Sequence, residues 1–216
     1  MAAVARRYRC DMAWDTDGTR RRLRDAALVE FAAHGLDGTS VAAIVARAGV
    51  NRERLYSYYG DKDALWEFVL STELEELAAA VRLTGTGLVD IGEFAGSVFD
   101  YHSAHPELGR LLQWEGLQHR PAANVEERTK LYREKVERFT EAQRQGQLDA
   151  GLDPAHLVFA LIALAAWWQT VPQLAEMITG AGPDDMDERA LRRRFTVEAA
   201  RRLAAPRGRA RDLEAK

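Results

Sequence analysis

Residues 51–59 carry side chains whose types and spacing suit the reading of DNA bases. Arginine can form two hydrogen bonds to guanine, and glutamate can accept one from the amino group of cytosine. Leu55 and Tyr59 are four residues apart, so on a helix they share one face and would pack into the core. The opposite face would present Arg52, Glu53 and Ser57, and the candidate base contacts are Arg52, Glu53, Arg54 and Ser57. The alternative interpretation, in which these are solvated surface charges that balance one another, remains open.

Residues 39–49 have the pattern of the first half of a helix-turn-helix. Thr39 is placed to cap a helix over residues 40–48, and Gly49 would end that helix in a tight turn. Asn51 would then cap the second helix. Thr39 and Ser40 would lie at a helix N-terminus, where hydroxyl and free backbone N–H groups can hold a DNA phosphate. We therefore expect Thr39, Ser40 and Asn51 to belong to the DNA-binding set.

A further helix is expected on each side of this motif. The first, over residues 19–34, has apolar residues at three- and four-residue spacing and is followed by Gly35 as a stop. The second begins at Lys62 and continues to about residue 82 without any linker rich in glycine, proline or serine. The segment that carries the motif is therefore predicted to be a small helical domain joined rigidly to the C-terminal part of the chain.

Residues 19–65 as a whole resemble the DNA-binding domain of the TetR family of bacterial regulators. The matching residues are Ala26, Ala27, Phe31, Gly35, Thr39, Ser40, Val41, Ile44, Ala48, Gly49, Val50, Leu55, Tyr56, Tyr58, Tyr59, Lys62 and Leu65. Two positions depart from the family pattern, because Asn51 stands where the family usually has serine and Tyr59 where it usually has phenylalanine. Asparagine caps a helix equally well and tyrosine keeps the ring, so the fold is not in doubt. The resemblance implies that Tyr58 and Lys62 contact DNA phosphates.

The whole chain is expected to be all-α, with about nine helices and no strands. Alanine, leucine, arginine and glutamate dominate the sequence, and no long stretch alternates with period two. Later helices are expected over residues 88–104, 107–118, 124–145, 154–177 (bent at Pro172) and 187–203. The predicted organisation is a flexible arm (1–18), a helix-turn-helix domain (19–65), a helical ligand-binding and dimerisation domain (66–205) and a flexible tail (206–216).

Composition and charge restrict the classes of protein that fit. The 216 residues have a formal net charge of −3 and are 47% hydrophobic, which is enough for a buried core. Residues 1–65 hold 11 Lys and Arg against 9 Asp and Glu, whereas the remainder is acidic, so a nucleic-acid contact is expected near the N-terminal end. The single cysteine, Cys10, excludes an intramolecular disulfide. The longest apolar run, 157–168, is shorter than the roughly 18 residues of a membrane span. With no signal-peptide pattern, we expect a cytoplasmic protein without a membrane partner.

The resemblance implies that the C-terminal domain forms a homodimer. Residues 105–108, 114–116 and 167–169 are similar to one branch of TetR-type C-terminal domains, in which the last two helices form a four-helix bundle with the partner. The helix over 154–177 is apolar nearly all round and needs cover on both sides. The candidate interface residues are Leu157, Leu161, Leu164, Ala165, Trp168 and Phe195. Burial of this helix wholly inside one monomer is the alternative.

The resemblance also implies a small-molecule effector bound among the middle helices. The candidate ligand-binding residues are mostly apolar or aromatic: Phe94, Val98, Phe99, Tyr101, His102, Leu111, Trp114 and Trp168. Such a lining suits a hydrophobic or planar molecule. An ordinary hydrophobic core is the competing interpretation, and no cofactor is expected.

The resemblance implies a transcriptional repressor that binds a palindromic operator in double-stranded DNA as a dimer and is released by its ligand. The alternative is a helical ligand-binding or metal-binding protein whose DNA binding is vestigial. His102 and His105 with Glu107, or Glu115 with His119, could place two metal ligands on one side of a helix, but the sequence offers no evident third and fourth ligand. No nucleotide-binding glycine loop or nucleophile elbow is present, so an enzyme is not expected.

Overall fold

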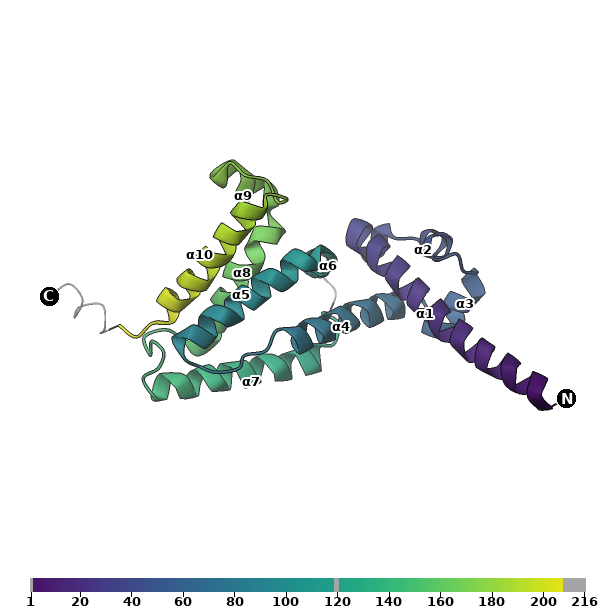
Figure 1. Cartoon of the computed structure of the whole chain (residues 1–216), viewed down its shortest axis with the longest axis horizontal. Helices are drawn as coiled ribbons and strands as arrows, with labels where there is room; N and C mark the ends of the chain where they lie inside the picture. Colours follow the sequence, from purple (N-terminus) through teal and green to yellow (C-terminus); the bar gives the residue numbers. More distant parts are fainter. Residues whose placement is uncertain (1, 119–120, 208–216) are drawn as a thin grey trace. The chain divides into compact units, whose positions relative to one another are not determined.

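A computed structural model describes residues 2–118 and 121–207, with side chains from residue 16 onward. Within these ranges the regular elements are ten helices, without strands (Figure 1), which confirms the all-α prediction. The helices are α1 (Ala2–Gly38), α2 (Val41–Ala48), α3 (Arg52–Tyr59), α4 (Lys62–Ala80), α5 (Leu88–Ala104), α6 (Pro106–Leu117), α7 (Val125–Arg144), α8 (Pro154–Thr170), α9 (Pro172–Thr179) and α10 (Met186–Ala204). The bend expected at Pro172 divides one predicted helix into α8 and α9, which differ in direction by 85°.

The chain forms two compact units. Among the described residues, the first unit contains those up to Leu74 together with Arg110–Ala123, and the second contains Glu75–Gly109 and the residues from Asn124 onward. The boundary expected at residue 65 therefore falls inside α4. Leu65, Trp66, Val69 and Leu70 of α4 are all buried, so this helix belongs to the core of the first unit well beyond the predicted boundary.

Helix α1 begins earlier than the sequence pattern predicts. The sequence predicts a flexible arm over residues 1–18 and a helix that starts near Thr19. In the structure α1 already begins at Ala2. Residues 2–18 contain no proline and a single glycine, Gly18, so nothing in this stretch forces a helix to start late. The stop expected at Gly35 is present as a break in the helix, where the backbone has a φ of 67°.

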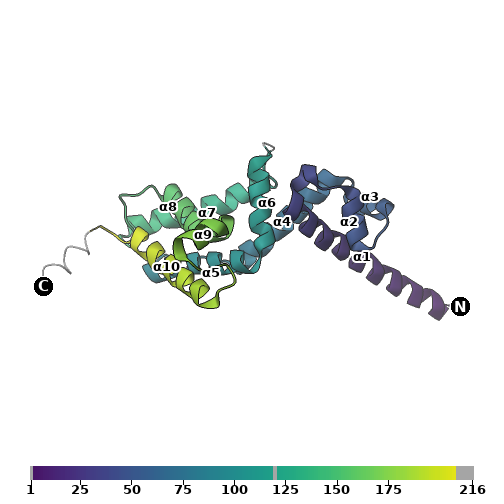
Figure 2. The ribbon, with the colours of Figure 1, turned by 90° about the horizontal axis from the view of Figure 1, so that it is seen from above.

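The second unit is built around three helices that lie side by side, α5, α8 and α10 (Figures 1 and 2). The fully buried side chains of Ile91 and Phe99 on α5 and Leu161 on α8 form its centre. Arg193 of α10 donates a 2.7 Å hydrogen bond to Asp100 of α5 and so fixes the two helices in register. In the part of the chain that is described, no single helix is long and apolar enough to cross a membrane, although α8 and α9 reach that length and composition as a bent pair.

Candidate nucleic-acid interface

Helices α2 and α3 are joined by a three-residue turn that local sequence signals account for. Gly49 takes the left-handed conformation with a φ of 63°, and Val50 donates a 3.1 Å hydrogen bond to the carbonyl of Val45. Asn51 caps α3, as predicted, because its side chain accepts a 3.1 Å hydrogen bond from the backbone N–H of Arg54. The side chain of Leu55 is fully buried and anchors α3 to the core of the unit.

The outer face of α3 is accessible. The exposed side chains on it are Arg52, Glu53, Arg54, Tyr56 and Ser57. Tyr59 is half-buried, and its hydroxyl donates a 3.0 Å hydrogen bond to the carbonyl of Arg20 in α1. Burial raises the pKa of the Tyr59 hydroxyl above its usual value, although the positive charge of Arg20 acts in the opposite direction. The orientation expected for this helix is therefore present, with Leu55 inward and Arg52, Glu53 and Ser57 outward.

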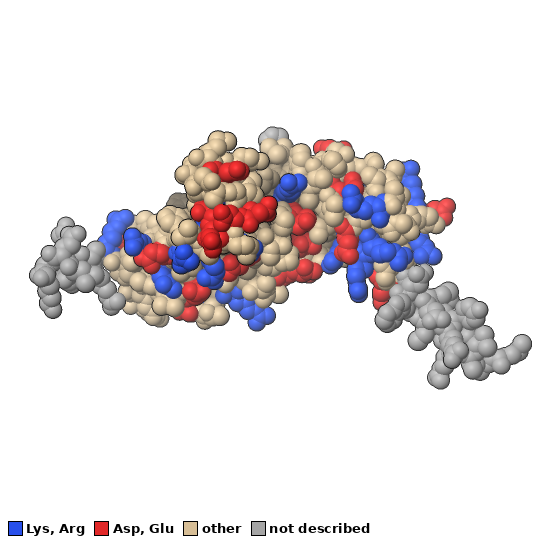
Figure 3. Space-filling model, turned by 45° about the horizontal axis from the view of Figure 1, so that its top comes forward, with Lys and Arg blue, Asp and Glu red and all other residues tan. Residues whose placement is uncertain are grey.

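Basic side chains gather on the first unit around this helix (Figure 3). Arg20, Arg21 and Arg22 of α1 are exposed, and the guanidinium of Arg20 lies 5.2 Å from the centre of the Tyr58 ring. Arg54 reaches Thr19 of α1 with an Nη1 to Oγ1 distance of 3.4 Å. These long-range contacts could not be inferred from spacing, since they join residues far apart in the sequence. A positively charged surface of this kind attracts a phosphate backbone.

Two predicted phosphate contacts have a different role in the fold. The hydroxyl of Thr39 is buried and donates to the backbone carbonyls of Glu30 and Gly35 at 3.1 and 2.7 Å. Its side chain is therefore not available to a phosphate, and Ser40, not Thr39, is the N-cap of α2, accepting from Ala43 at 3.1 Å. The reason is that the last carbonyls of α1 lack partners within the helix and take donors from elsewhere in the unit.

Lys62 is the second of these residues. Its ammonium group donates to the carbonyls of Leu36 and Thr39 at 2.7 and 2.9 Å, so it ties the start of α4 to the end of α1. A lysine ammonium has three donors, and two are engaged in this way. The structure thus gives Lys62 a scaffold role that the sequence did not indicate, and a phosphate contact through the remaining donor stays a prediction.

The predicted dimer residues are divided between the inside and the outside of the second unit. Leu157, Leu161 and Ala165 are buried in the core of the unit, and an interface role for them stays a prediction. Leu164 and Trp168 are half-buried, and Phe195 is exposed. The large apolar side chains that face outward on α8 and α10 are Phe159, Trp167, Met186, Leu191, Phe195 and Leu203. Because α8 is apolar on every side, its sequence does not show which half faces the core.

The predicted ligand-binding residues are divided between the two units. Phe94, Val98, Phe99, Tyr101 and His102 are buried on α5 in the second unit, whereas Leu111 and Trp114 belong to the first unit. The Nε1–H of Trp114 donates to the carbonyl of Ala32 at 3.3 Å. A β-carbon on Gly35 would lie 2.8 Å from the Trp114 ring, so this indole packs directly on the end of α1. Trp168 instead packs against Phe195, with ring centres 6.1 Å apart.

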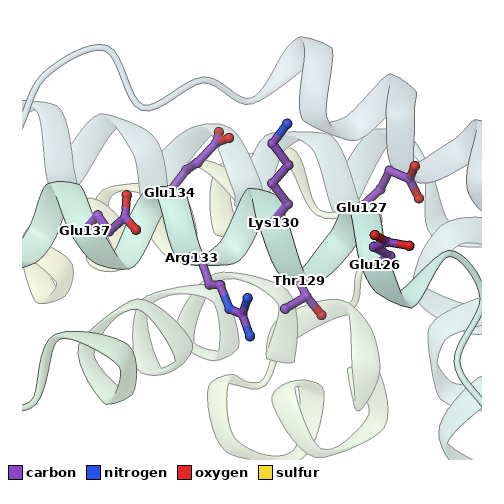
Figure 4. Close-up of a pocket in the computed structure, with 7 residues that line it drawn as sticks. All are labelled: Glu126, Glu127, Thr129, Lys130, Arg133, Glu134 and Glu137. Atoms are coloured by element: carbon purple, nitrogen blue, oxygen red, sulfur yellow. The ribbon is translucent and has the colours of Figure 1, made fainter.

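A hollow of about 800 Å³ lies along α7 (Figure 4). Its lining is charged or polar, and consists of Glu126, Glu127, Thr129, Lys130, Arg133, Glu134 and Glu137. Figure 4 shows Lys130 and Glu134 on one side of the helix and Arg133 on another, so these charges do not converge on a common point. None of the predicted ligand-binding residues lines this hollow, and its composition does not suit a hydrophobic molecule.

The buried histidine His102 of α5 should make the stability of the second unit depend on pH. Burial, and secondarily the charge of His105, lowers the pKa of His102 below its usual value near 6.5. As the pH falls below about 6.5, the unfolded chain therefore takes up a proton before the folded chain does, and the free energy of unfolding decreases. We expect urea denaturation between pH 7.5 and 5.5 to show this loss, at up to about 1.4 kcal/mol per pH unit.

The variant His102→Asn should lose that part of the pH dependence. His34→Asn is the matched control, because the side chain of His34 is exposed on α1. An unchanged slope in His102→Asn would show that other groups carry the acid sensitivity.

The described residues contain no group of three or more His, Cys, Asp or Glu side chains that could hold a metal ion. Glu115, one of the residues considered for such a site, instead accepts a 2.8 Å hydrogen bond from the backbone N–H of Ala123. His119 lies outside the described residues.

Comparison with known proteins tests the resemblance seen in the sequence. Residues 23–68 match the family model described as bacterial regulatory proteins of the tetR family, and residues 90–202 match the tetracyclin repressor-like C-terminal domain. The chain is 36% identical over 175 residues to the HTH-type transcriptional repressor SCO4008 of Streptomyces coelicolor, a match that covers 80% of this chain and 90% of that protein. The chain belongs to the TetR family of bacterial transcriptional regulators.

Other TetR-family proteins are similar in sequence or structure. The HTH-type transcriptional regulator RutR of Escherichia coli K12 is 29% identical over 168 residues, covering 75% of this chain and 79% of RutR. The crystal structure of the transcriptional regulator SCO4942 from Streptomyces coelicolor superposes with a TM-score of 0.74 and 30% identity, covering 86% of this chain and 98% of that one. The similarity extends through both units. The resemblance inferred from residues 19–65 is therefore confirmed, and the similarity to TetR-family proteins covers most of this chain.

Proposed function

We propose that this TetR-family regulator is a repressor that binds a palindromic operator as a homodimer and is released by a small hydrophobic or aromatic molecule. The observation that carries the proposal is the helix α3, which is capped by Asn51, anchored by Leu55 and exposed along the face of Arg52 and Glu53. A rigid helix with its polar face in solvent is what a major groove admits. Repression is supported by the similarity to the repressor SCO4008. The cytoplasm, where bacterial DNA lies, is the proposed place of action.

The outward apolar face of α8 and α10 supports the dimer. Phe159, Trp167, Leu191 and Phe195 are all more than half exposed. Monomeric proteins rarely leave clustered large apolar side chains in water, and a two-fold partner would cover them. The same symmetry would present two copies of α3 to successive major grooves about 34–36 Å apart, or a multiple of it.

Ligand release is proposed to act through α4. This helix runs without interruption from Lys62 to Ala80, and its first residue is hydrogen bonded to the end of α1. A ligand that tilts α4 would alter the separation of the two α3 helices and weaken operator binding. Spin labels at the exposed residue Glu67 of α4 would measure the distance between the two copies of this helix in the proposed dimer, and so report a tilt of α4. Release of DNA by a ligand with no change in this distance would contradict the mechanism.

The operator is the first object to find. Bound DNA would be selected from genomic fragments, and the preferred fragment titrated by fluorescence anisotropy at several salt concentrations. We expect a palindromic sequence and an affinity that falls steeply with salt. If the confirmed dimer binds no fragment even at low salt, the proposed function is wrong and the alternative of a helical ligand-binding protein takes its place.

Two substitutions are expected to affect this binding differently. Arg52→Ala should remove the preference for one base pair in each half-site, at a cost of about 1–3 kcal/mol for that contact pair. Lys62→Ala should weaken all DNA sequences alike and also lower the melting temperature, because the carbonyls of Leu36 and Thr39 lose their donor. Lys130→Ala, an exposed lysine on α7, is the control and should change neither property.

A further inference from the structure

Tyr56 lies one helical turn after Arg52 on the exposed face of α3, and the two side chains are joined. The Nε and Nη2 atoms of Arg52 donate to the Tyr56 hydroxyl oxygen at 3.2 and 2.9 Å. The guanidinium carbon also lies 5.4 Å from the centre of the Tyr56 ring. The hydroxyl thus engages one edge of the guanidinium and leaves the other edge unobstructed.

That geometry matters for base recognition because a guanidinium carries five N–H donors in a planar fork. The Tyr56 hydroxyl takes the Nε–H and one Nη2–H. The Nη1 donors and the second Nη2–H remain at the far end, and these form the pair that can bind O6 and N7 of one guanine. Among the described residues, the structure records no other hydrogen bond of the Arg52 guanidinium.

The helix that carries Arg52 and Tyr56 is held firmly by the fold. Both residues stand on a helix whose N-terminus is capped by Asn51 and whose inner side is held by the buried Leu55. A free arginine side chain has several rotatable bonds, and ordering it on binding costs entropy. A hydroxyl that already holds the guanidinium in place lowers that cost for the one orientation it favours.

The neighbouring arginine lacks such an arrangement. Arg54 reaches toward α1 and contacts Thr19 at 3.4 Å, so its guanidinium is directed at the protein. Arg52 is therefore the side chain on this helix that is held outward with its far edge available.

We infer that Tyr56 is a positioning residue that holds the Arg52 guanidinium for a bidentate contact with guanine and so sets the base preference of the operator half-site. The inference depends on the proposed function, because it presupposes an operator that Arg52 reads. Tyr56 acts here through Arg52, and removal of its hydroxyl alone should reduce discrimination while the helix stays folded.

The test compares Tyr56→Phe, Arg52→Ala and the double variant on two DNA duplexes, the selected operator and one in which the base pair read by Arg52 is replaced. That base pair is identified as the one whose preference disappears in Arg52→Ala. The measured quantity is the ratio of the two affinities, together with the dependence of each affinity on salt. Tyr132→Phe on α7 is the matched control, because Tyr132 is 41% exposed and Tyr56 is 39% exposed.

Tyr56→Phe should lower the affinity ratio roughly three- to tenfold, as expected for the loss of one ordinary hydrogen bond on an exposed surface. It should leave the salt dependence and the melting temperature unchanged, and have no further effect on the ratio in the Arg52→Ala background. Tyr132→Phe should leave the ratio at the wild-type value.

The inference is overturned if Tyr56→Phe weakens both duplexes equally, does so in the Arg52→Ala background as well, and reduces the salt dependence. That result would assign Tyr56 to a direct phosphate contact. These outcomes are distinct from failure of the proposed function, in which the wild-type protein itself selects no operator.

Discussion

Replacing Trp167 by glutamate is expected to convert the protein to a monomer and to lower operator affinity by about 100-fold or more. Trp167 is 56% exposed, and it shares the outward stripe of α8 with Phe159, which is 74% exposed. Large aromatic side chains at the centre of an interface contribute disproportionately to binding. A glutamate carboxylate buried there without a partner would cost several kcal/mol. A monomer would also lose the second half-site, and with it the gain from binding two linked sites at once.

The measurement is sedimentation equilibrium at micromolar concentration, followed by anisotropy titration of the operator. Val89→Glu is the matched control, because Val89 is 65% exposed on a helix that does not carry the apolar face. Its position in the first turn of α5 also favours a negative charge. The control should remain dimeric and bind as the wild type does. A dimeric Trp167→Glu protein with wild-type affinity would show that the face of α8 and α10 is not the interface.

The elements that the sequence predicted correctly are those with local signals. Gly49 and Asn51 mark the turn between α2 and α3, and both take the roles that their types indicate. Pro172 marks the break between α8 and α9. The start of α1 was not predictable in this way, because residues 2–18 contain no proline that would mark where the helix begins.

The candidate site shows the same division between local and long-range information. The outward orientation of Arg52 followed from the four-residue spacing of Leu55 and Tyr59. The burial of Thr39 did not, because its hydrogen-bond partners are carbonyls of α1 whose position depends on the packing of the whole unit. Tyr56 was recognised only as a family match, although its spacing of four from Arg52 is a signal that could have indicated the pair.

The C-terminal unit was harder to predict for a related reason. An apolar helix such as α8 contains no information on which half is inward, so the core residue Leu161 and the outward residue Trp167 look alike in the sequence. Trp114 illustrates a second limit. It lies on a helix that begins in one unit and continues in the other, and its contact with α1 joins residues 82 positions apart.

The second large effect is expected where α10 packs on α5, at Gly92 and Gly96. A β-carbon on Gly92 would lie 2.5 Å from Nε of Arg201, and one on Gly96 would lie 2.9 Å from a methyl group of Val197. Both distances are too short for contact. The long side chain of Arg201 can rotate aside at Gly92, whereas Val197 is buried between the helices, so relief of the contact at Gly96 requires α10 to move away from α5. The ion pair of Arg193 with Asp100, at 2.7 Å, would be strained by the same movement.

The double variant Gly92→Ala with Gly96→Ala is expected to lower the free energy of unfolding by about 2 kcal/mol, mostly through Gly96. Overpacking costs about 1–3 kcal/mol at each site, and the higher helix propensity of alanine offsets part of it. Urea denaturation at a fixed protein concentration measures the change, since the proposed dimerisation would make stability concentration-dependent. Gly116→Ala on α6 is the control, because a β-carbon there meets nothing within 4 Å, and it should be neutral or slightly stabilising. If the double variant were as stable as this control, α10 would not be held closely against α5. The outward face that α10 shares with α8 would then lack a rigid support.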